Sequence, residues 1–491
     1  MRTSRLHKPP PRAILFYDMN KTPFLILLAA AFAPAVFAAT SVTQFGITWT
    51  FDKPQKIGQY ITGDWWVVGP VTVKSVTPAP ITADDPKDWR NGSMVNPPAG
   101  VHVGYDGRLH FFETSLWAEF PLDLKPGDSL VSTASFDDLK DTTPDVLPEN
   151  AAPAAPLRTA TVLTCVAEPP PADAFRPAFS GTWKEQFTVS QIRRDLLPSL
   201  AVPEGLSESD LPNLAELERK LERVWLDNQQ EWVSRNLHPR ENMPGYGREI
   251  SWTTISAALL LAFEDPQKER ETLLLRYIQR GIDYYGITQS HDNLWTPNGG
   301  HNHGRKLPIL VAGKLLGHEG MLNVKATFQE DAMTYYARCW TGAKVCAQGT
   351  HEEKPPEEWT ADGRGKPGDP ERVGAGSDFR AEAYRKQNGS QFASTALAAW
   401  IFNVVEAWNH PPFFDYADRW MTEDYPPLLE RKQKAADSEG LARAISHGHT
   451  RQGWAGSKFT QALWEKYRPK FQPAPDRWKG GDPLPIPEET K

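Results

Sequence analysis

The sequence contains few cysteines, and their spacing excludes two kinds of site. There are three in 491 residues, and no two form a Cys-x-x-Cys pair, which excludes a structural zinc site of that kind. None stands in the sequence context of a catalytic nucleophile. Cys339 and Cys346 are close enough for a disulfide in an exported chain, and Cys165 is then left over near the end of an expected strand.

Long apolar runs and basic stretches are also scarce. Beyond the N-terminal region, no segment is apolar over the length that crosses a bilayer. Residues 39–491 hold 49 Lys and Arg against 60 Asp and Glu, a net charge of −11, without a strongly basic stretch. We therefore expect no nucleic-acid binding and no integral membrane segment in the mature protein. An anionic ligand is compatible with this charge if it enters a locally positive cleft.

The N-terminal residues have the pattern of a secretory signal peptide. Five Lys and Arg residues lie within the first 21, an apolar run over 24–37 follows, and Val36-Phe37-Ala38 resembles a cleavage site. Met19 is an alternative start, and a short membrane anchor is the alternative interpretation of the apolar run. We expect cleavage of residues 1–38 after Ala38, and a secreted or periplasmic protein.

Two periodicities divide the remaining chain. Residues 41–165 contain short alternating segments separated by Gly, Pro, Asp and Asn, which predict a β-sandwich. Residues 166–190 are rich in proline and predict a linker. Helical spacing of apolar residues then predicts an all-α (α/α) toroid or incomplete barrel over 191–475, with a tail at 476–491. The clearest helices are expected at 214–236, 250–263, 269–285, 307–316, 321–340, 390–408 and 413–421.

A Gly-rich segment, residues 295–305, carries the densest group of polar side chains and leads into the expected helix 307–316. Gly299, Gly300 and Gly304 allow tight turns and a close approach of the backbone to a ligand. The polar side chains then lie near a helix N-terminus, where anions are favoured. They are His301, Asn302, His303 and Arg305.

His, Tyr, Asn and Arg side chains together suit β-elimination on a uronic acid. The C5 proton beside the carboxylate is weakly acidic, so cations or amides must stabilise the enolate-like intermediate. A base removes this proton and an acid protonates the leaving oxygen. We predict a histidine base and a tyrosine acid: His303 or His301, and Tyr335 or Tyr336. The expected substrate contacts are Asn302, Arg305, Arg248, Tyr246, Tyr384, Arg385 and Trp295.

The two histidines allow other interpretations. They could cap the helix 307–316 and bond to loop carbonyls. Together with His291 or a carboxylate they could instead bind a metal, but two histidines at this spacing are a weak signal, so we expect no metal and no cofactor. One of Tyr335 and Tyr336 could equally belong to the core.

These features together resemble the secreted polysaccharide lyases of the α/α-toroid type, the alginate lyase and heparinase-like group. Asn302-His303 is similar to the Asn-His pair that those enzymes place at the cleft. The resemblance covers the architecture of about residues 190–470, and it implies a tyrosine and an arginine in the remaining roles: Tyr335 or Tyr336, and Arg305 or Arg248. The order of the modules differs, since the β module of many members follows the toroid and here precedes it.

Three functions are therefore compared. The first is a secreted lyase that cleaves an anionic, uronic-acid-containing polysaccharide. The second is a glycoside hydrolase on the same kind of toroid, which needs two carboxylates roughly 5–10 Å apart. The third is a non-catalytic carbohydrate-binding surface protein, in which the β module and the abundant aromatic side chains bind sugar rings. The candidate carboxylates of the hydrolase are Glu249, Asp283, Asp292, Glu330 and Asp331.

Overall fold

The computed structural model describes residues 37–150, 155–230, 232–264, 270–336, 345–347, 379–422 and 453–472. Several expectations lie outside these residues. They concern residues 1–36 of the signal peptide expected at 1–38, the thiol of Cys339, the tail at 476–491 and the side chains of Cys346, Tyr384 and Arg385. Cys165 is a buried free thiol near the end of its strand, and burial raises its pKa to about 12.

The first part of the chain forms one mixed sheet. Its strands run in the order β5-β7-β8-β3-β2-β4-β6, with β1 paired to β2. Most neighbours are antiparallel, but β3 and β8 are parallel. The strands are β1 (Phe37–Gln44), β2 (Ile47–Gln59), β3 (Trp65–Val68), β4 (Val71–Thr77), β5 (Ser93–Val95), β6 (Leu122–Leu124), β7 (Ser129–Ser135) and β8 (Leu157–Val166).

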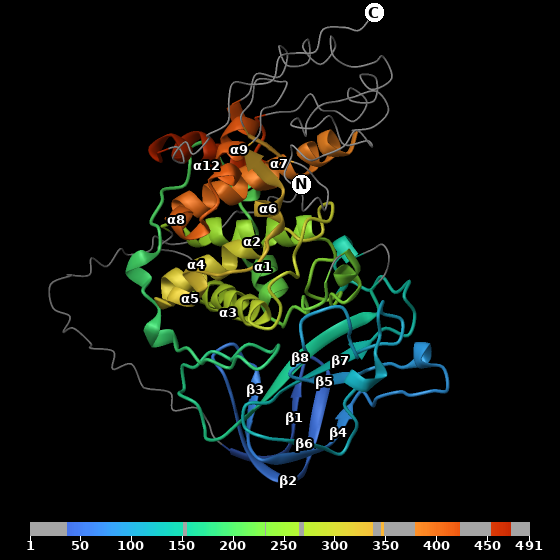
Figure 1. The fold of residues 1–491 in the computed structure, drawn as a ribbon. Coiled ribbons are helices and arrows are strands. Elements are labelled where there is room, and N and C mark those ends of the chain that lie inside the picture. Colours follow the sequence, from blue (N-terminus) through green and yellow to red (C-terminus); the bar gives the residue numbers. More distant parts are fainter. Residues whose placement is uncertain are drawn as a thin grey trace, which may run out of the picture.

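The sheet is curled, and each of its two faces has a core (Figure 1). Alternation along β7 and β8 separates them: Leu130 and Leu163 pack inside the curl, whereas Val131 and Val162 face the helices. The predicted β-sandwich is therefore wrong, because a single curled sheet replaces two packed sheets. Local alternation predicts strands, but it does not show that β8 pairs with both β7 and the distant β3.

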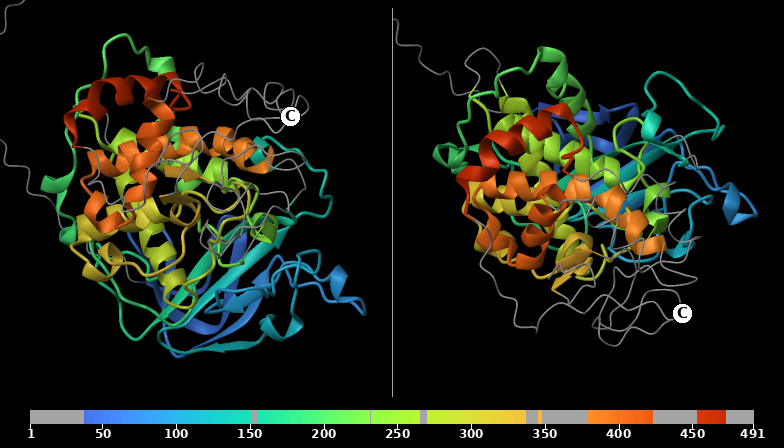
Figure 2. Two further views of the ribbon diagram at one scale, coloured as in Figure 1. Left: turned by 45° about the horizontal axis from the view of Figure 1, so that its top comes forward. Right: turned by 90° about the horizontal axis from the view of Figure 1, so that it is seen from above.

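Helices cover the second face of the sheet, with α7, α9 and α12 farthest from it (Figures 1 and 2). α2 contacts α1, α3, α4 and α7, and most of its side chains are buried, as expected for a helix inside a core. The helices are α1 (Leu214–Leu221), α2 (Gly247–Leu261), α3 (Glu271–Thr288), α4 (Lys306–Leu316), α5 (Glu319–Leu322), α6 (Gln329–Ala332), α7 (Phe379–Ile401), α8 (Val405–Trp408), α9 (Pro411–Thr422) and α12 (Lys458–Tyr467).

The prediction of an all-α toroid is also wrong. Helices account for only about a third of the residues, and α5, α6 and α8 have four residues each. The helix expected at 214–236 ends at Leu221, and that expected at 321–340 is replaced by α6 and the short strand β9 (Thr334–Tyr336), which pairs with β10 (Val345–Ala347). Helical spacing over a long window overestimates helix length when loops with buried side chains continue the pattern.

Several single-turn 3₁₀ helices connect these elements, and one of them, η7 (Trp232–Asn236), lies beside the candidate site described below. The others are η1 (Pro86–Asp88), η2 (Thr114–Leu116), η3 (Pro148–Asn150), η4 (Val189–Gln191), η5 (Arg194–Leu196), η6 (Glu208–Asp210) and η9 (Arg468–Lys470). Within the part of the chain that the structure describes, no helix is both long and apolar enough to span a bilayer.

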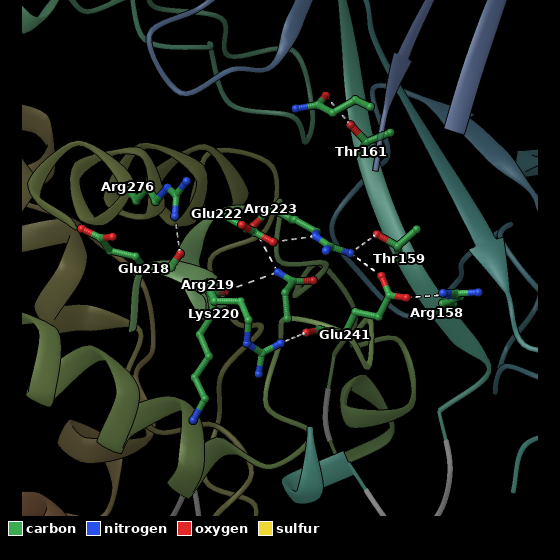
Figure 3. A network of polar contacts seen from close by, with 12 residues as sticks. Arg158, Thr159, Thr161, Glu218, Arg219, Lys220, Glu222, Arg223, Glu241 and Arg276 are labelled. Carbon is green, nitrogen blue, oxygen red and sulfur yellow. Dashed lines mark hydrogen bonds and ion pairs between the residues drawn. The ribbon is translucent and has the colours of Figure 1, made fainter. Parts of the chain in front are cut away.

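Charged side chains join the sheet to the helical part. Figure 3 shows Glu241 between Arg158 and Arg223, and Arg223 also donates to Thr159 of β8. A second junction is fully buried: Arg176 donates to Asp64 at 2.9 Å and to Asp283 of α3 at 2.7 Å. Arg176 lies in the segment expected to be a linker, and Phe175 and Phe179 of the same segment are buried in the core shared by sheet and helices.

We predict that Arg176→Met lowers the free energy of unfolding by about 3–5 kcal/mol, because it removes the hydrogen-bonded cation that two buried carboxylates share. Arg194→Met is the matched control, since the ion pair of Arg194 with Glu271 is about half exposed, and it should cost less than about 1 kcal/mol. Urea unfolding of both variants measures the difference. Equal losses would contradict a special role of the buried junction.

Candidate functional site

The Gly-rich loop ends at α4, as expected. Its Gly304 allows a close contact with α2, not with a ligand. Gly304 has a φ of 89°, and a Cβ atom there would lie 2.6 Å from the Cα of Ser251. From the other side, a Cβ on Gly247, the first residue of α2, would lie 2.0 Å from the carbonyl oxygen of His301. The loop and the N-terminus of α2 thus touch backbone to backbone.

A buried ion pair fixes the end of the Gly-rich loop to Asp227, in the segment that follows α1. The guanidinium of Arg305 donates to both carboxylate oxygens of Asp227, at 2.7 and 3.0 Å, and neither residue is exposed. Nε2 of His238 lies 3.4 Å from the same carboxylate. Burial alone would raise the pKa of Asp227, but Arg305 and His238 together lower it to about 2. Arg305 is therefore neutralised inside the protein and is not placed to meet a substrate carboxylate.

His303, one of the two predicted bases, is buried. Its Nε2 lies 3.0 Å from Oδ1 of Asn388 in α7 and 3.1 Å from Nε2 of Gln329, so it donates to the first or accepts from the second. Its ring also packs edge-to-face with that of Phe392 at 5.2 Å. Burial lowers the pKa of His303 to about 3, so the ring is neutral at ordinary pH.

His301 is the half-buried histidine of the loop. Its ring packs at 4.5 Å against that of Tyr246, in an edge-to-face arrangement. The hydroxyl of Tyr246 accepts the backbone N–H of Gly300 at 3.0 Å, which fixes the tyrosine against the loop. Burial, and then the positive charges of Arg235 and Arg305, lower the pKa of His301 to about 4. The imidazole is therefore neutral near pH 7 and able to accept a proton.

A cavity of about 210 Å³ opens on the tyrosine that packs against this histidine. Tyr246 is part of its wall, and so are Arg235 and Arg248. The guanidinium of Arg248 also lies over the ring of Tyr246, 5.5 Å from its centroid. The remaining lining residues are Glu149, Asn150, Ala155, Gly245 and Glu249. Two arginines, two glutamates and a tyrosine thus line one opening, and the ring of His301 packs against the tyrosine.

An internal carboxylate already occupies the N-terminal side of α4. Oε1 of Glu330 accepts the backbone N–H of Gly304 at 2.6 Å, and Oε2 has no partner among the described residues. Burial raises the pKa of Glu330 to about 7, although the bond from Gly304 partly offsets this. The acidic group at this helix end is therefore a side chain of the protein. Below pH 7, its carboxyl is protonated in at least half of the molecules.

The other predicted site residues are separated by the fold. Trp295 is buried, and its ring stacks on that of Phe328 at 5.9 Å. Asn302 is also buried, and its Nδ2 donates to the carbonyl of Thr296 at 2.7 Å. Tyr335 and Tyr336 lie in β9, not in a helix, and their hydroxyls donate to the Ala332 carbonyl and to Asp415.

Sequence reasoning missed Arg235, Asp227 and Gln329. Arg235 lies in η7, inside a segment predicted to be part of a long helix, so nothing local marked it as a cavity residue. Gln329 donates to the carbonyl of Gly299 and accepts from the N–H of Asn302 at 2.8 Å. Such roles depend on contacts between distant segments, and no sequence spacing indicates them.

No group of three or more His, Cys, Asp or Glu side chains in the described ranges is placed to hold a metal ion. Comparisons of the chain with protein-family models, with curated proteins and with solved structures gave no match.

We predict that Glu330→Gln changes how stability depends on pH. The carboxyl ionises near 4.5 when unfolded and near 7 when folded. Its stabilising contribution is therefore complete below pH 4.5 and is lost as the pH rises to 7. The substituted amide keeps an acceptor for the Gly304 N–H without a charge, so the variant should gain on the order of 2–3 kcal/mol relative to wild type between pH 4.5 and 8. Parallel pH profiles of urea unfolding would contradict this.

We also predict that His303→Ala destabilises the protein by about 2–4 kcal/mol, since it leaves a cavity and removes the partner of Asn388. His301→Ala is the matched variant on the same loop, and it should cost about 1 kcal/mol or less because the ring is only half buried. Thermal unfolding of both proteins measures the contrast, and a fully stable His303→Ala protein would overturn it.

Proposed function

We propose that this protein is a secreted or periplasmic lyase that cleaves a uronic-acid-containing polysaccharide by β-elimination, without a cofactor. The observation that supports it most is a cavity lined by Tyr246, Arg235 and Arg248, with the neutral ring of His301 packed edge-to-face against Tyr246. Arg235 and Arg248 can pair with the carboxylate of an acidic sugar, which at Arg248 would replace Glu249 as the partner. The catalytic and binding roles that the sequence predicted for His303, Arg305, Tyr335 and Tyr336 are here assigned to side chains at or beside this cavity.

In this mechanism the substrate carboxylate binds Arg235 and Arg248, which stabilise the negative charge that develops beside C5. The imidazole of His301 takes the C5 proton. The C5–H bond breaks, its electron pair forms the C4–C5 double bond, and the C4–O bond breaks. Tyr246 gives its proton to the leaving oxygen, and the N–H of Gly300 stabilises the charge left on the phenol oxygen. Solvent then returns a proton to Tyr246 and takes one from His301.

One observation favours a hydrolase as the second candidate. Glu149 and Glu249 line the same cavity. In each, Oε1 accepts from a cation, Lys220 or Arg248, whereas Oε2 is buried without a partner among the described residues. Of the other carboxylates considered from the sequence, Asp283 is paired with Arg176, Asp331 with Lys306, and Glu330 with the Gly304 N–H.

The product distinguishes these functions. The mature protein is incubated with alginate, polygalacturonate, hyaluronan and neutral glucans, and both near-UV absorbance and reducing ends are followed. A lyase forms an absorbing C4–C5 double bond with each cut, whereas a hydrolase forms reducing ends alone. We predict absorbance with a uronic polymer and a loss of about 10²–10⁴ in kcat/KM for His301→Ala.

Tyr246→Phe should show a loss of similar order, because it removes the proton donor, together with the acceptor of the Gly300 N–H. Glu249→Gln is the contrasting variant: it should keep unsaturated product within about tenfold of wild type if the lyase is correct, and abolish cleavage if the carboxylates act. Reducing ends without absorbance, lost in Glu249→Gln and kept in His301→Ala, would replace the lyase by the hydrolase. Binding of a polysaccharide without cleavage would support a non-catalytic carbohydrate-binding protein.

A further inference from the structure

Exposed aromatic side chains gather between the loop 98–112 and η7. Phe111 is 51% exposed and Trp232 is 42% exposed. The ring of His110 contacts both, at 6.5 Å and 5.3 Å between centroids, and His102 contacts Phe111 at 6.2 Å. Both histidines are exposed as well. We call these four residues the aromatic cluster. A contiguous group of exposed rings on a protein surface usually marks a binding site.

Buried amides hold this loop in place. Nε2 of Gln229 donates to the carbonyls of Val101 and His110, both at 2.8 Å, and Nδ2 of Asn228 donates to the carbonyl of Pro98 at 2.8 Å. Both amide side chains are buried. The two residues directly follow Asp227, which holds Arg305, so one segment supports both the aromatic cluster and the Gly-rich loop. The cluster is therefore preformed rather than gathered by chance on a mobile loop.

Phe111 has a strained backbone. Its φ of 56° lies in the left-handed region, which costs an aromatic residue about 1–2 kcal/mol compared with glycine or asparagine. Packing in a core does not offset this strain, because half of the side chain is exposed. Strain that is kept for an exposed ring points to a role of that ring in binding.

The helix η7 connects the aromatic cluster to the cavity that Arg235 lines. Trp232 and Arg235 are three residues apart in η7, and side chains at this spacing lie one above the other in a 3₁₀ helix. The rise is about 6 Å. Arg235 lines the cavity beside His301, so the ring of Trp232 is next to the place where the proposed function puts the carboxylate.

We propose that Phe111 and Trp232 form a sugar-binding subsite for the pyranose unit adjacent to the one cleaved, a proposal that rests on the proposed function. The apolar face of a sugar ring packs on an aromatic ring, and the imidazoles of His102 and His110 can hydrogen-bond its hydroxyl groups. The subsite holds the polymer by the faces of its rings, while the arginines of the cavity hold the acidic group of the next unit. The ligand is thus a chain of at least two pyranose units.

Binding is measured apart from cleavage, by affinity electrophoresis of the full chain in native gels that contain alginate, polygalacturonate or hyaluronan. Wild type should be retarded by at least one uronic polymer, and Trp232→Ala should weaken the affinity roughly tenfold. Phe111→Asn is the sharper variant, because asparagine tolerates the left-handed backbone. It should weaken binding to a similar extent while raising the midpoint of thermal unfolding, a combination that a structural role would not give.

Trp454→Ala is the matched control, since this tryptophan is 39% exposed and lies outside the aromatic cluster; its retardation should equal that of wild type. Unchanged retardation of Trp232→Ala and Phe111→Asn would overturn the subsite. The subsite would also be overturned if no polymer retarded the wild type, even if the aromatic cluster bound a protein or lipid vesicles instead.

Failure of the subsite and failure of the lyase are distinguishable. If wild type forms unsaturated products and both aromatic variants keep its KM, the lyase stands without the subsite. If retardation depends on Trp232 but no double bond is formed, the subsite stands without the lyase. When both are correct, Trp232→Ala raises KM for the polymer roughly tenfold and leaves kcat nearly unchanged.

Discussion

The buried ion pair between Asp227 and Arg305 supports both functional surfaces. It fixes the Gly-rich loop above the segment that follows α1, and the next residues, Asn228 and Gln229, fix the loop that carries Phe111. Because the pair is neutral overall and fully buried, Arg305 is unavailable to a ligand. The arginines that line the cavity are Arg235 and Arg248.

Burial then decides which ionisable groups can react. It keeps His303 neutral and enclosed, and it keeps the Glu330 carboxyl protonated to about pH 7. His301 has the same chemistry as His303, but its ring is only half buried and lies beside Tyr246. The proposed chemistry lies at the rim of the loop, where neutral His301 packs on a tyrosine that lines a cavity together with two arginines. The deeper residues position this rim.

Particular elements show how far the sequence could be interpreted. The apolar residues after the Gly-rich loop predicted α4 almost to the residue, and the alternation over 41–165 predicted that this part of the chain forms strands. The β-sandwich and the toroid failed because each depends on how distant segments pair: β8 lies between β7 and β3, and Phe175 of the expected linker enters the core. The same holds for the site, where Arg235 and Tyr246 line one cavity although they are eleven positions apart in the chain.

The sequence by itself determined the kinds of local structure and the chemical character of the loop 295–305. These follow from the spacing of apolar residues and from glycines whose backbones must turn or touch α2. Only the tertiary structure decided which histidine is accessible, which arginine is neutralised and which exposed rings stand beside the cavity. Solvent exposure and charge pairing depend on neighbours supplied by remote parts of the chain, and two residues in one short motif, His301 and His303, differ for that reason alone.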